Sequence, residues 1–352
     1  MLISVSINPD EMKMFKVFAS EYIELKKVGN KCYLISDNSD GYFFLKTDVL
    51  NGATEKDFHI RIESVYFKNI TKERKISIGL TVSNVTLNFY DENDKFIYSY
   101  EVQRYLGIAS VENFLNLISK KDDYEKFNIK LMLPMITLAS NLNTKIYSHG
   151  DGFISCEVNG SYAYHDTKIN IPRFSIPANT LLKAVRLNEV VYFIQDYIYL
   201  CNGNFNLFLY KYRVDCFNIK QWLSTKKMSF ILNIDLKTAN RFIGSINTDE
   251  NDNFILSFKN KEIIIKNDKR TVKLVIDDII KKEKSLNVSF EKLLENINNG
   301  NTVESKVLSD IKIPRWVFKY VVNFDKLVIG ISTNFVIISS KNRKVIIPRK
   351  DY

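Results

Sequence analysis

The chain has 352 residues, of which 45% are hydrophobic, and it carries a formal net charge of +10. This length and apolar content suffice for two or three domains with buried cores, which excludes a disordered chain. The charge favours an acidic partner such as nucleic acid, although a solvated lysine-rich surface is the commoner cause of such an excess.

The sequence gives little support for a membrane protein, a disulfide-stabilised protein or a metalloprotein. No apolar run approaches the length that crosses a bilayer, and the N-terminus lacks the basic and small-residue regions of a signal peptide. We therefore expect a cytoplasmic protein with no membrane partner. The cysteines form no CxxC pair, which predicts reduced thiols, with a disulfide or zinc site as the lesser alternative: Cys32, Cys156, Cys201 and Cys216. The three histidines complete no ligand spacing, so we expect no metal and no cofactor.

In the first 104 residues the same order of elements occurs twice: a strand, a short helix and then three strands. We call each occurrence of this order a pass. The first pass has a strand at 2–7, a helix from Pro9 to Tyr22 opened by Asn8, and the strands IELKK, KCYLIS and YFFLKTDV. The second pass has FHIRI, a helix from Ser64 to Lys72, and the strands ISIGLTVS, VTLNFYD and KFIYSYEV. Residues 105–125 read as a connector that is partly helical.

The third and fourth passes follow the same order. The third has the strand FNIKLML, a helix from Pro134 to Leu142, and the strands TKIYSHG, GFISCEVNG and SYAYHDTKIN. The fourth begins with a strand from Phe174 to Ile176, and Pro177 leads into a helix from Ala178 to Asn188. The strands VVYFIQ, YIYLCNG and NFNLFLYKYRV complete it.

The fifth and sixth passes follow the connector CFNIKQWLSTKK. The fifth has MSFILNI, a helix LKTANRFIGSI capped by Asp235, and the strands NFILSFKN, KEIIIKN and RTVKLVID. A charged segment near 277–311, with a helical patch from Phe290 to Ile297, interrupts the sixth pass and reads as an insertion. After Pro314 the pattern resumes with the helix RWVFKYVVN and the strands KLVIGIS, FVIISS and KVIIPRK.

Six such passes predict an α+β protein of three domains with two passes each. A unit of this kind cannot close its own core and must stand beside copies of itself. The predicted domains are 1–125 with the connector, 126–222, and 223–352 with the insertion near 277–311.

Cations recur on the predicted helices at a spacing that places each pair on one side. Five of the six helices carry such a pair at i,i+3 or i,i+4, opposite an apolar face: Lys13 and Lys16, Lys68 and Lys72, Lys183 and Arg186, Lys237 and Arg241, and Arg315 and Lys319. On any single helix, an ordinary solvated face explains the pair better. Its recurrence favours contact with the regularly spaced phosphates of a duplex.

This repeat, with its length and its C-terminal strand KVIIPRK, resembles the bacterial-type DNA sliding clamp, the polymerase processivity factor. The resemblance implies helices on the inner face and sheets on the outer face of a ring. It also implies that two chains associate head to tail, encircle double-stranded DNA and turn the cation pairs toward the pore. The basic overall charge departs from the family and is compatible with a divergent viral or phage member.

The resemblance further implies a pocket between the second and third domains for short peptides of the DNA polymerase and the clamp loader. Carried over position by position, its residues are Tyr162, Tyr164, His165, Asn218, Trp222, Leu223, Ile346, Ile347, Pro348 and Arg349. Asn218 stands where the family usually has proline, and three residues follow Arg349, so the pocket is expected to accept a different peptide. The purely structural alternatives are that Trp222 anchors a core and that Pro348 marks a strand end.

Other functional classes remain open at this point. The chain contains no HExxH, GxSxG or GxxxxGK[ST] motif, and we therefore expect no enzymatic activity. A non-encircling basic DNA-binding processivity factor is the nearer alternative, and a β-rich virion structural protein is the alternative outside DNA binding.

Overall fold

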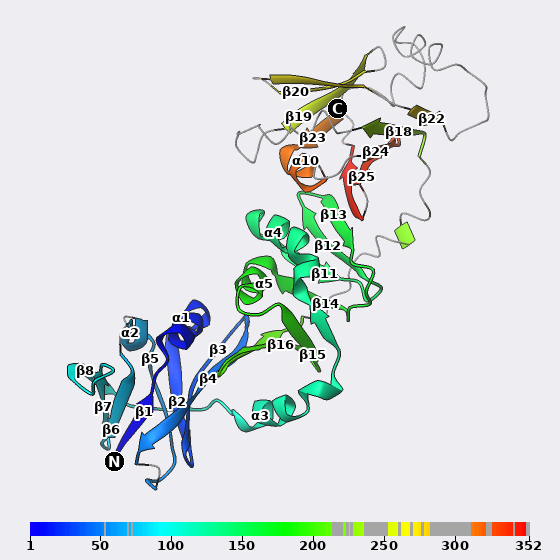
Figure 1. Ribbon diagram of the computed structural model, residues 1–352. Helices are drawn as coiled ribbons and strands as arrows, with labels where there is room; N and C mark the ends of the chain where they lie inside the picture. The colour runs from blue at the N-terminus through cyan, green and yellow to red at the C-terminus, as the bar shows by residue number, and fades with distance from the viewer. Residues whose placement is uncertain are drawn as a thin grey trace. The chain divides into compact units, whose positions relative to one another are not determined.

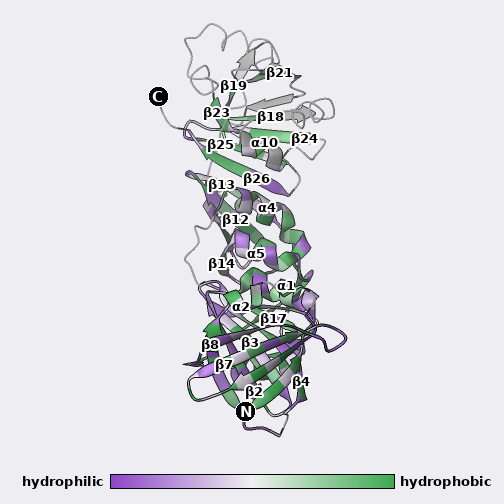
Figure 2. Ribbon diagram, turned by 90° about the vertical axis from the view of Figure 1, so that its left-hand side faces the viewer, coloured by the Kyte–Doolittle hydropathy of each residue, from purple (hydrophilic) through white to green (hydrophobic). Residues whose placement is uncertain are grey.

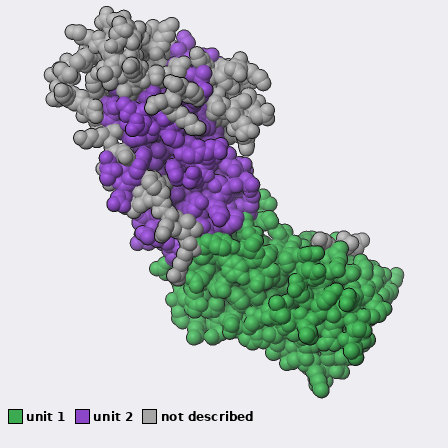
Figure 3. All heavy atoms as spheres, turned by 180° about the vertical axis from the view of Figure 1, so that it is seen from behind, with its two compact units in different colours: residues 1–130, 180–212 green, residues 131–179, 213–352 purple. Residues whose placement is uncertain are grey.

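The structure is a computed structural model, and it describes residues 1–52, 54–68, 70–71, 73–212, 221–222, 225, 228–235, 253–259, 262–267, 270–275, 278–281, 311–321, 326–340 and 342–349. The chain divides into two compact units (Figure 3). Unit 1 comprises Met1–Lys130 and Thr180–Tyr212, and unit 2 comprises Leu131–Asn179 and Arg213–Tyr352. Residues 126–222, one domain in the sequence prediction, contribute to both units, and the three domain boundaries stay a prediction. In the part of the chain that the structure describes, no helix has the length and hydropathy to cross a membrane.

Unit 1 is built on a 13-stranded antiparallel sheet, counted over its described residues. Strand β4 lies at its centre and pairs with β3, β1 and β17, and β8 ends one branch of the sheet. The strands are β1 (Leu2–Ser6), β2 (Tyr22–Val28), β3 (Lys31–Asn38), β4 (Gly41–Asn51), β5 (Phe58–Glu63), β6 (Lys75–Leu80), β7 (Asn84–Tyr90), β8 (Phe96–Gln103), β9 (Tyr105–Leu106), β10 (Lys126–Asn128), β15 (Val190–Ile194), β16 (Tyr197–Asn202) and β17 (Phe205–Tyr210).

The pairing of β4 with β17 joins the first predicted domain to the second within one core. Leu207 lies opposite Phe43, and helix α1 (Pro9–Phe18) packs over this face of the sheet. The rings of Phe15 and Phe43 lie 5.7 Å apart, and all three side chains are fully buried. Burial of such aromatic side chains stabilises the joined sheet by about 1.5–3 kcal/mol each.

The other helices of unit 1 are short. They are α2 (Val65–Lys68), α3 (Glu112–Ser119), the 3₁₀ turn η1 (Lys121–Asp123), and α5 (Ala178–Val185), which begins in unit 2. Figure 1 shows α1 and α5 on one side of the sheet of unit 1 and α3 on the other. The two sides of the sheet are therefore covered by different helices.

Unit 2 contains two antiparallel sheets within its described residues. The nine-stranded sheet has the order β14 (Phe174–Pro177), β11 (Lys145–Ser148), β12 (Phe153–Val158), β13 (Ser161–Asp166), β26 (Arg343–Pro348), β25 (Phe335–Ser340), β24 (Lys326–Ile331), β18 (Phe230–Asp235) and β22 (Asp278–Lys281). The four-stranded sheet has the order β21 (Arg270–Val275), β20 (Glu262–Asn267), β19 (Asn253–Lys259) and β23 (Ile311–Pro314).

Two helices, α4 (Leu133–Asn141) and α10 (Arg315–Val321), contact each other and cover one face of the nine-stranded sheet. The 3₁₀ turn η2 (Ile129–Met132) precedes α4. Buried apolar residues from α4, such as Ile136, and from α10, such as Val317, form the core under this face. Figure 2 shows hydrophobic residues, in green, running along the strands of both units.

The α+β class predicted from the sequence is confirmed, and most differences lie at element ends. Helix α1 stops at Phe18 instead of Tyr22, because Ser36 Oγ accepts from the backbone N–H of Ser20 and the next strand starts at Tyr22. Helices α2 and α5 are also shorter than predicted, and the predicted end of the helix RWVFKYVVN lies outside the described residues. The predicted strand FNIKLML is wrong after Asn128, where η2 and then α4 follow, and α4 begins at Leu133, one residue before the predicted start.

The predicted insertion lies partly within the described residues. Its beginning, at Asp278–Lys281, forms strand β22 and pairs with β18, and its end enters β23. The predicted helices at LKTANRFIGSI and at Phe290 to Ile297 lie outside the described residues. Among the described residues, Cys32, Cys156 and Cys201 are free cysteines, whereas Cys216 lies outside them. Burial raises the pKa of the Cys32 and Cys156 thiols to about 12.

Candidate functional site

The cation pair of α1 is divided between two environments. Lys13 stays exposed and forms an ion pair with Asp10 at 2.9 Å, in the first turn of the helix. Lys16 instead donates from Nζ to the carbonyl oxygen of Ile70 at 2.6 Å, and burial lowers the pKa of its amine. Lys16 therefore ties α1 to the segment after α2, and Lys13 is the cation of this pair that faces solvent.

Helix α5 carries its cations on the side away from the core. Leu181 and Ala184 are fully buried, whereas Lys183 and, in the turn after the helix, Arg186 are exposed. This is the one-sided arrangement that their spacing predicts. A role of these cations in DNA binding stays a prediction.

The other predicted cations are only partly placed. Lys68 lies at the end of α2, and Arg315 and Lys319 lie in α10, but their side chains are outside the described part of the structure. Lys72, Lys237 and Arg241 are outside it altogether.

Several predicted peptide-binding residues gather on one face of the sheet of unit 2. Ile346 of β26 lies opposite Tyr162 of β13, and two residues along, Lys344 lies opposite Tyr164, so these side chains share one face. They join a cluster that we call the β13–β26 surface: Phe153, Tyr162, Tyr164, Trp222, Met228, Phe335, Ile337 and Ile346. This face is the one opposite α4 and α10.

Trp222 packs on this surface from the connector between the second and third predicted domains. Its ring centroid lies 5.0 Å from that of Phe335, with the planes tilted by 59°. Tyr164 is buried, which raises the pKa of its hydroxyl, and the Lys344 ammonium lies 5.7 Å from the centre of its ring. The surface thus combines aromatic rings with a cation at its margin.

Two other predicted residues, His165 and Ile347, lie on the opposite, helix-covered face and are buried. Next to His165 on this face, Arg343 donates from Nη1 to the carbonyl oxygen of Tyr320 in α10 at 2.8 Å. Burial, followed by the nearby Arg343 charge, lowers the pKa of His165. The structure therefore does not bring His165 and Ile347 together with Tyr162 and Ile346.

The C-terminal residues of the predicted site lie beside the β13–β26 surface. Pro348 is exposed and lies opposite Phe335 in the ladder. Arg349 donates from Nη1 to the carbonyl oxygen of Ser332 at 3.2 Å, which fixes the end of β26 against the turn before β25. Asn218 and Leu223 lie outside the described residues.

The sequence prediction missed four members of the surface, Phe153, Met228, Phe335 and Ile337. Alternation along a strand was the available signal for two of them. Because Ile337 pairs with Ile346 and Phe335 lies two residues earlier, both must share the face of Ile346 once β25 is paired with β26. The same alternation separates Ile346 from Ile347.

Unit 1 has a corresponding cluster, which we call the β4–β17 surface: Tyr33, Ile35, Tyr42, Phe44, Tyr197, Tyr199 and Phe208. The connector helix α3 covers it with Phe114, Leu115, Leu117 and Ile118. The ring of Phe114 stacks on that of Tyr42, with centroids 3.9 Å apart and planes within 5°. It also lies edge-on to Phe208 at 4.8 Å.

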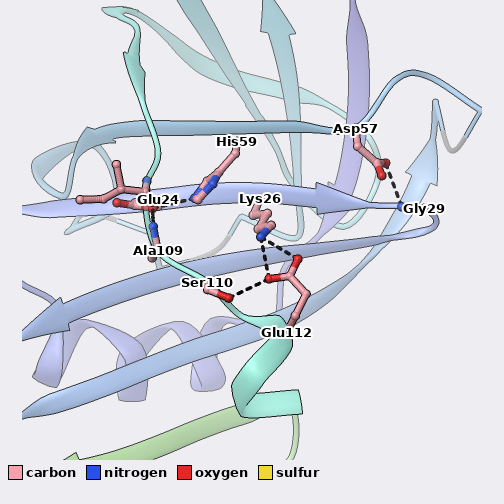
Figure 4. Close-up of polar contacts among 9 residues, drawn as sticks. Glu24, Lys26, Gly29, Asp57, His59, Ala109, Ser110 and Glu112 are labelled. Atoms are coloured by element: carbon pink, nitrogen blue, oxygen red, sulfur yellow. Dashed lines mark hydrogen bonds and ion pairs between the residues drawn. The ribbon is translucent and has the colours of Figure 1, made fainter. Parts of the chain in front are cut away.

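Glu24 of β2 fixes the connector that leads into α3 (Figure 4). Its Oε2 accepts from the backbone N–H groups of Ile108 at 3.0 Å and Ala109 at 2.8 Å, and lies 2.6 Å from Nε2 of His59. A Cβ at Gly107 would collide with the His59 ring. A carboxylate that accepts several such bonds holds the backbone more strongly than neutral partners would.

Two residues along β2, Lys26 fixes the start of α3. Its Nζ lies 2.7 Å from Glu112 Oε1 and 2.8 Å from Oε2, and Ser110 Oγ donates to the same carboxylate (Figure 4). The hydrogen bond from Lys26 lowers the pKa of Glu112 to about 2. Figure 4 also shows Asp57 accepting from the N–H of Gly29, at the end of β2.

Within the described residues, no group of three or more histidine, cysteine, aspartate or glutamate side chains is placed to hold a metal ion. The arrangement offers exposed cations on helices and two aromatic sheet surfaces. Both features suit binding to other macromolecules.

Comparison with known proteins rests on structure, since no protein-family model and no curated protein sequence matches the chain. The DNA polymerase III subunit beta from Pseudomonas aeruginosa superposes with a TM-score of 0.63 at 10% identity, covering 99% of this chain and 100% of that one. The Helicobacter pylori beta clamp bound to a DNA ligase peptide gives 0.59 at 11% identity, with 99% of both chains covered.

The corresponding subunit from Borrelia burgdorferi, solved with a natural product, gives a TM-score of 0.58 at 13% identity. It covers 100% of this chain and 99% of its own. The likeness runs through the whole chain in each case. The chain therefore has the α+β fold of the bacterial DNA polymerase III beta sliding clamps, as its sequence predicts.

Proposed function

We propose that the chain is a DNA sliding clamp, which encircles duplex DNA and tethers a replicative DNA polymerase as its processivity factor. The observation that carries this proposal is the likeness to beta clamps over 99% of this chain and 100% of the Pseudomonas aeruginosa subunit. The proposed activity requires no catalytic group and no cofactor.

The exposed cations on the helices support a sliding contact with DNA. Lys13, Lys183 and Arg186 are exposed and would contact phosphates, which carry charge but no sequence information. Contacts of this kind impose little register along the duplex and weaken as salt rises. Retention would then come from the closure of a ring around the DNA.

A ring of two chains, joined head to tail, is the assembly that we propose. Strand β8 is the last strand of its branch in the described sheet of unit 1, and it exposes Phe96 and Ile97. An exposed strand edge with apolar side chains is a template for pairing with another chain. The edge of β8 is therefore the proposed contact for a second copy.

The β13–β26 surface is the proposed docking site for short peptides of the polymerase and the clamp loader. It gathers Tyr162, Tyr164, Trp222 and Ile346 at one place, and the Helicobacter pylori clamp of the same fold is solved with a DNA ligase peptide. Pro348 and Arg349 lie at its margin. A polymerase held there would stay at high effective concentration near the primer end.

The decisive experiment compares retention on closed and open DNA. The protein is incubated at low salt with linear DNA, whose ends admit a closed ring, and the DNA is then joined into a circle by a ligase. The complex is challenged with raised salt on a sizing column, and the circle is then cut once. A clamp stays on the circle at raised salt and leaves after linearisation. A non-encircling DNA-binding factor leaves circle and linear DNA at the same salt. A virion structural protein shows no retention on either DNA.

A further inference from the structure

The β4–β17 and β13–β26 surfaces correspond residue by residue. In unit 1, Tyr42 of β4 lies opposite Phe208 of β17, and in unit 2, Tyr162 of β13 lies opposite Ile346 of β26. In each case the last strand of one pass pairs antiparallel with the last strand of a distant pass. Phe44 and Tyr164, two residues further along, correspond in the same way.

The correspondence extends to the next strand. Tyr197 of β16 lies opposite Tyr210 of β17, and Phe335 of β25 lies opposite Pro348 of β26. Tyr210 lies two residues beyond Phe208 in β17, and Pro348 lies two residues beyond Ile346 in β26. Tyr197 and Phe335 therefore occupy the same place on the two surfaces.

The β4–β17 surface already holds an amphipathic helix, which the chain supplies as α3. Phe114 lies 5.4 Å from Tyr197 in addition to its contacts with Tyr42 and Phe208. No residue of α3 is fully buried, so the helix lies on the surface and its apolar side chains stay partly accessible. A separate helical peptide bound to such a surface would lie in the same way, but on the β4–β17 surface the helix belongs to the chain itself.

On the β13–β26 surface, Trp222 holds the place that corresponds to Phe114. Trp222 packs on Phe335, the counterpart of Tyr197, and like Phe114 it comes from the connector that precedes the next predicted domain. It also stays partly exposed. Trp222 thus occupies on this surface the position that Phe114 of α3 occupies on the other.

We propose that the β13–β26 surface binds an amphipathic helical peptide of the α3 type, and that the aromatic side chain of the peptide displaces Trp222. The ligand has an aromatic residue followed by aliphatic residues at the spacing of Phe114, Leu115, Leu117 and Ile118, with polar residues on its other side. This inference rests on the proposed peptide-binding role of the surface and not on the proposed contact with DNA.

The test uses a fluorescent peptide with the sequence of residues 110–121, added to the full-length protein and followed by anisotropy. Trp222→Ala removes the internal competitor, so the peptide is expected to bind about three- to tenfold more tightly. Tyr162→Ala removes an anchoring ring, and binding is expected to weaken about fivefold or more. Tyr105→Ala, an exposed tyrosine of unit 1, serves as the matched control and leaves binding unchanged.

A second measurement locates the peptide. A photoreactive residue in place of Phe114 in the peptide is expected to cross-link to β13, β25 or β26, and a peptide with serine at the positions of Phe114 and Leu117 is expected not to compete. Weaker binding to Trp222→Ala would show that Trp222 is a wall of the site and would overturn the displacement. Cross-links to β4 or β17 alone, or to α3 of a second copy, would overturn the assignment of the surface.

Retention on circular DNA, measured on the same preparations, separates this inference from the proposed function. End-dependent retention without peptide binding would refute the inference and leave the clamp function standing. Peptide binding at the β13–β26 surface without end-dependent retention would refute the clamp function and leave the inference standing.

Discussion

Single polar side chains decide where the connector of unit 1 lies. Glu24 accepts two backbone N–H groups that lie 84 and 85 residues away in the sequence, and Lys26 holds the carboxylate of Glu112. These contacts hold α3 over the β4–β17 surface together with its apolar side chains. No local sequence pattern indicates such pairs, because their members meet only after β2 has joined the sheet.

The Lys26–Glu112 pair makes a predictable contribution to stability as a function of pH. The pKa of Glu112 is about 2 in the folded chain and 4.5 in its ordinary state. The pair therefore stabilises the fold fully above pH 4.5 and loses its effect as the pH falls toward 2. Glu112→Gln should lower the free energy of unfolding at pH 6 by less than about 1 kcal/mol, because the pair is partly exposed. Urea unfolding at pH 6 and pH 3 should show the difference from wild type shrinking at the lower pH.

Lys26→Met provides the control for this prediction. In that background the Glu112→Gln change should have a smaller effect, because the largest cause of the lowered pKa is gone and only weaker ones, such as the hydrogen bond from Ser110, remain. An effect of Glu112→Gln on unfolding that is the same at both pH values, or that is undiminished without Lys26, would mean that the pair does not cause it.

Side-chain direction along a strand was readable from the sequence. Tyr162 and Tyr164 lie two residues apart, and the structure places both on the β13–β26 surface. His165 follows Tyr164 directly, so the alternation points it to the helix-covered face. Lys16 shows the opposite case, since its bond to the Ile70 carbonyl depends on a turn that its helical spacing does not predict.

Helices of this chain begin where the sequence indicates and end where tertiary contacts decide. Pro9 opens α1 and Asn8 accepts the N–H of Asp10 at 3.0 Å, both of which are local signals. The early end of α5 at Val185 has no comparable signal, and Asn188 Nδ2 donates to the carbonyl oxygen of Cys201 in β16. Helix ends were therefore less predictable than helix starts.

Helix α5 provides the cleanest test of the DNA-facing cations. The double change Lys183→Glu and Arg186→Glu alters only exposed side chains, so thermal stability should stay the same. If both cations contact phosphates, DNA affinity should fall and the slope of log affinity against log salt should decrease by about 2. Fluorescence anisotropy with a duplex at several salt concentrations measures both.

Lys120→Glu is the matched control, because this exposed cation follows α3 on the other side of the sheet. Its salt slope should stay that of the wild type. An equal loss of affinity in the control would indicate that overall charge, and not the position of the cations on the helices, governs attraction to DNA.

At the scale of the whole molecule, the strand order within each pass was predictable and the pairing between distant passes was not. Apolar alternation and turn residues identify the strands that became β2, β3 and β4. Nothing local indicates that β4 pairs with β17, whose residues lie more than 150 positions later. The choice depends on which sheet edges fit together after the passes have formed.

The proposed ring predicts the effect of a change at the free edge of unit 1. Ile97→Lys places a charge on β8, where an added strand from a second chain would bury it. The mass in solution, measured by light scattering, should shift from dimer to monomer while the circular dichroism spectrum stays that of the folded wild type. Val82→Lys, at a fully accessible turn residue of the same sheet, should leave the mass unchanged.

A chain that is monomeric before the Ile97→Lys change would contradict the proposed dimer, and a chain that is dimeric after it would place the contact between copies elsewhere. In the first case the retention test on circular DNA would still decide between an open assembly and a ring.

The strand pairing also limits how a gene for this protein can be shortened. A product ending at residue 125 would keep β4 but lack β17, and one ending at residue 222 would keep β13 but lack β26. Each truncation would leave a strand edge without its neighbour, and unpaired edges promote aggregation. Because residues 126–222 serve both units, no single break in the reading frame yields two self-sufficient halves. Deleting one domain should therefore compromise the domain beside it as well.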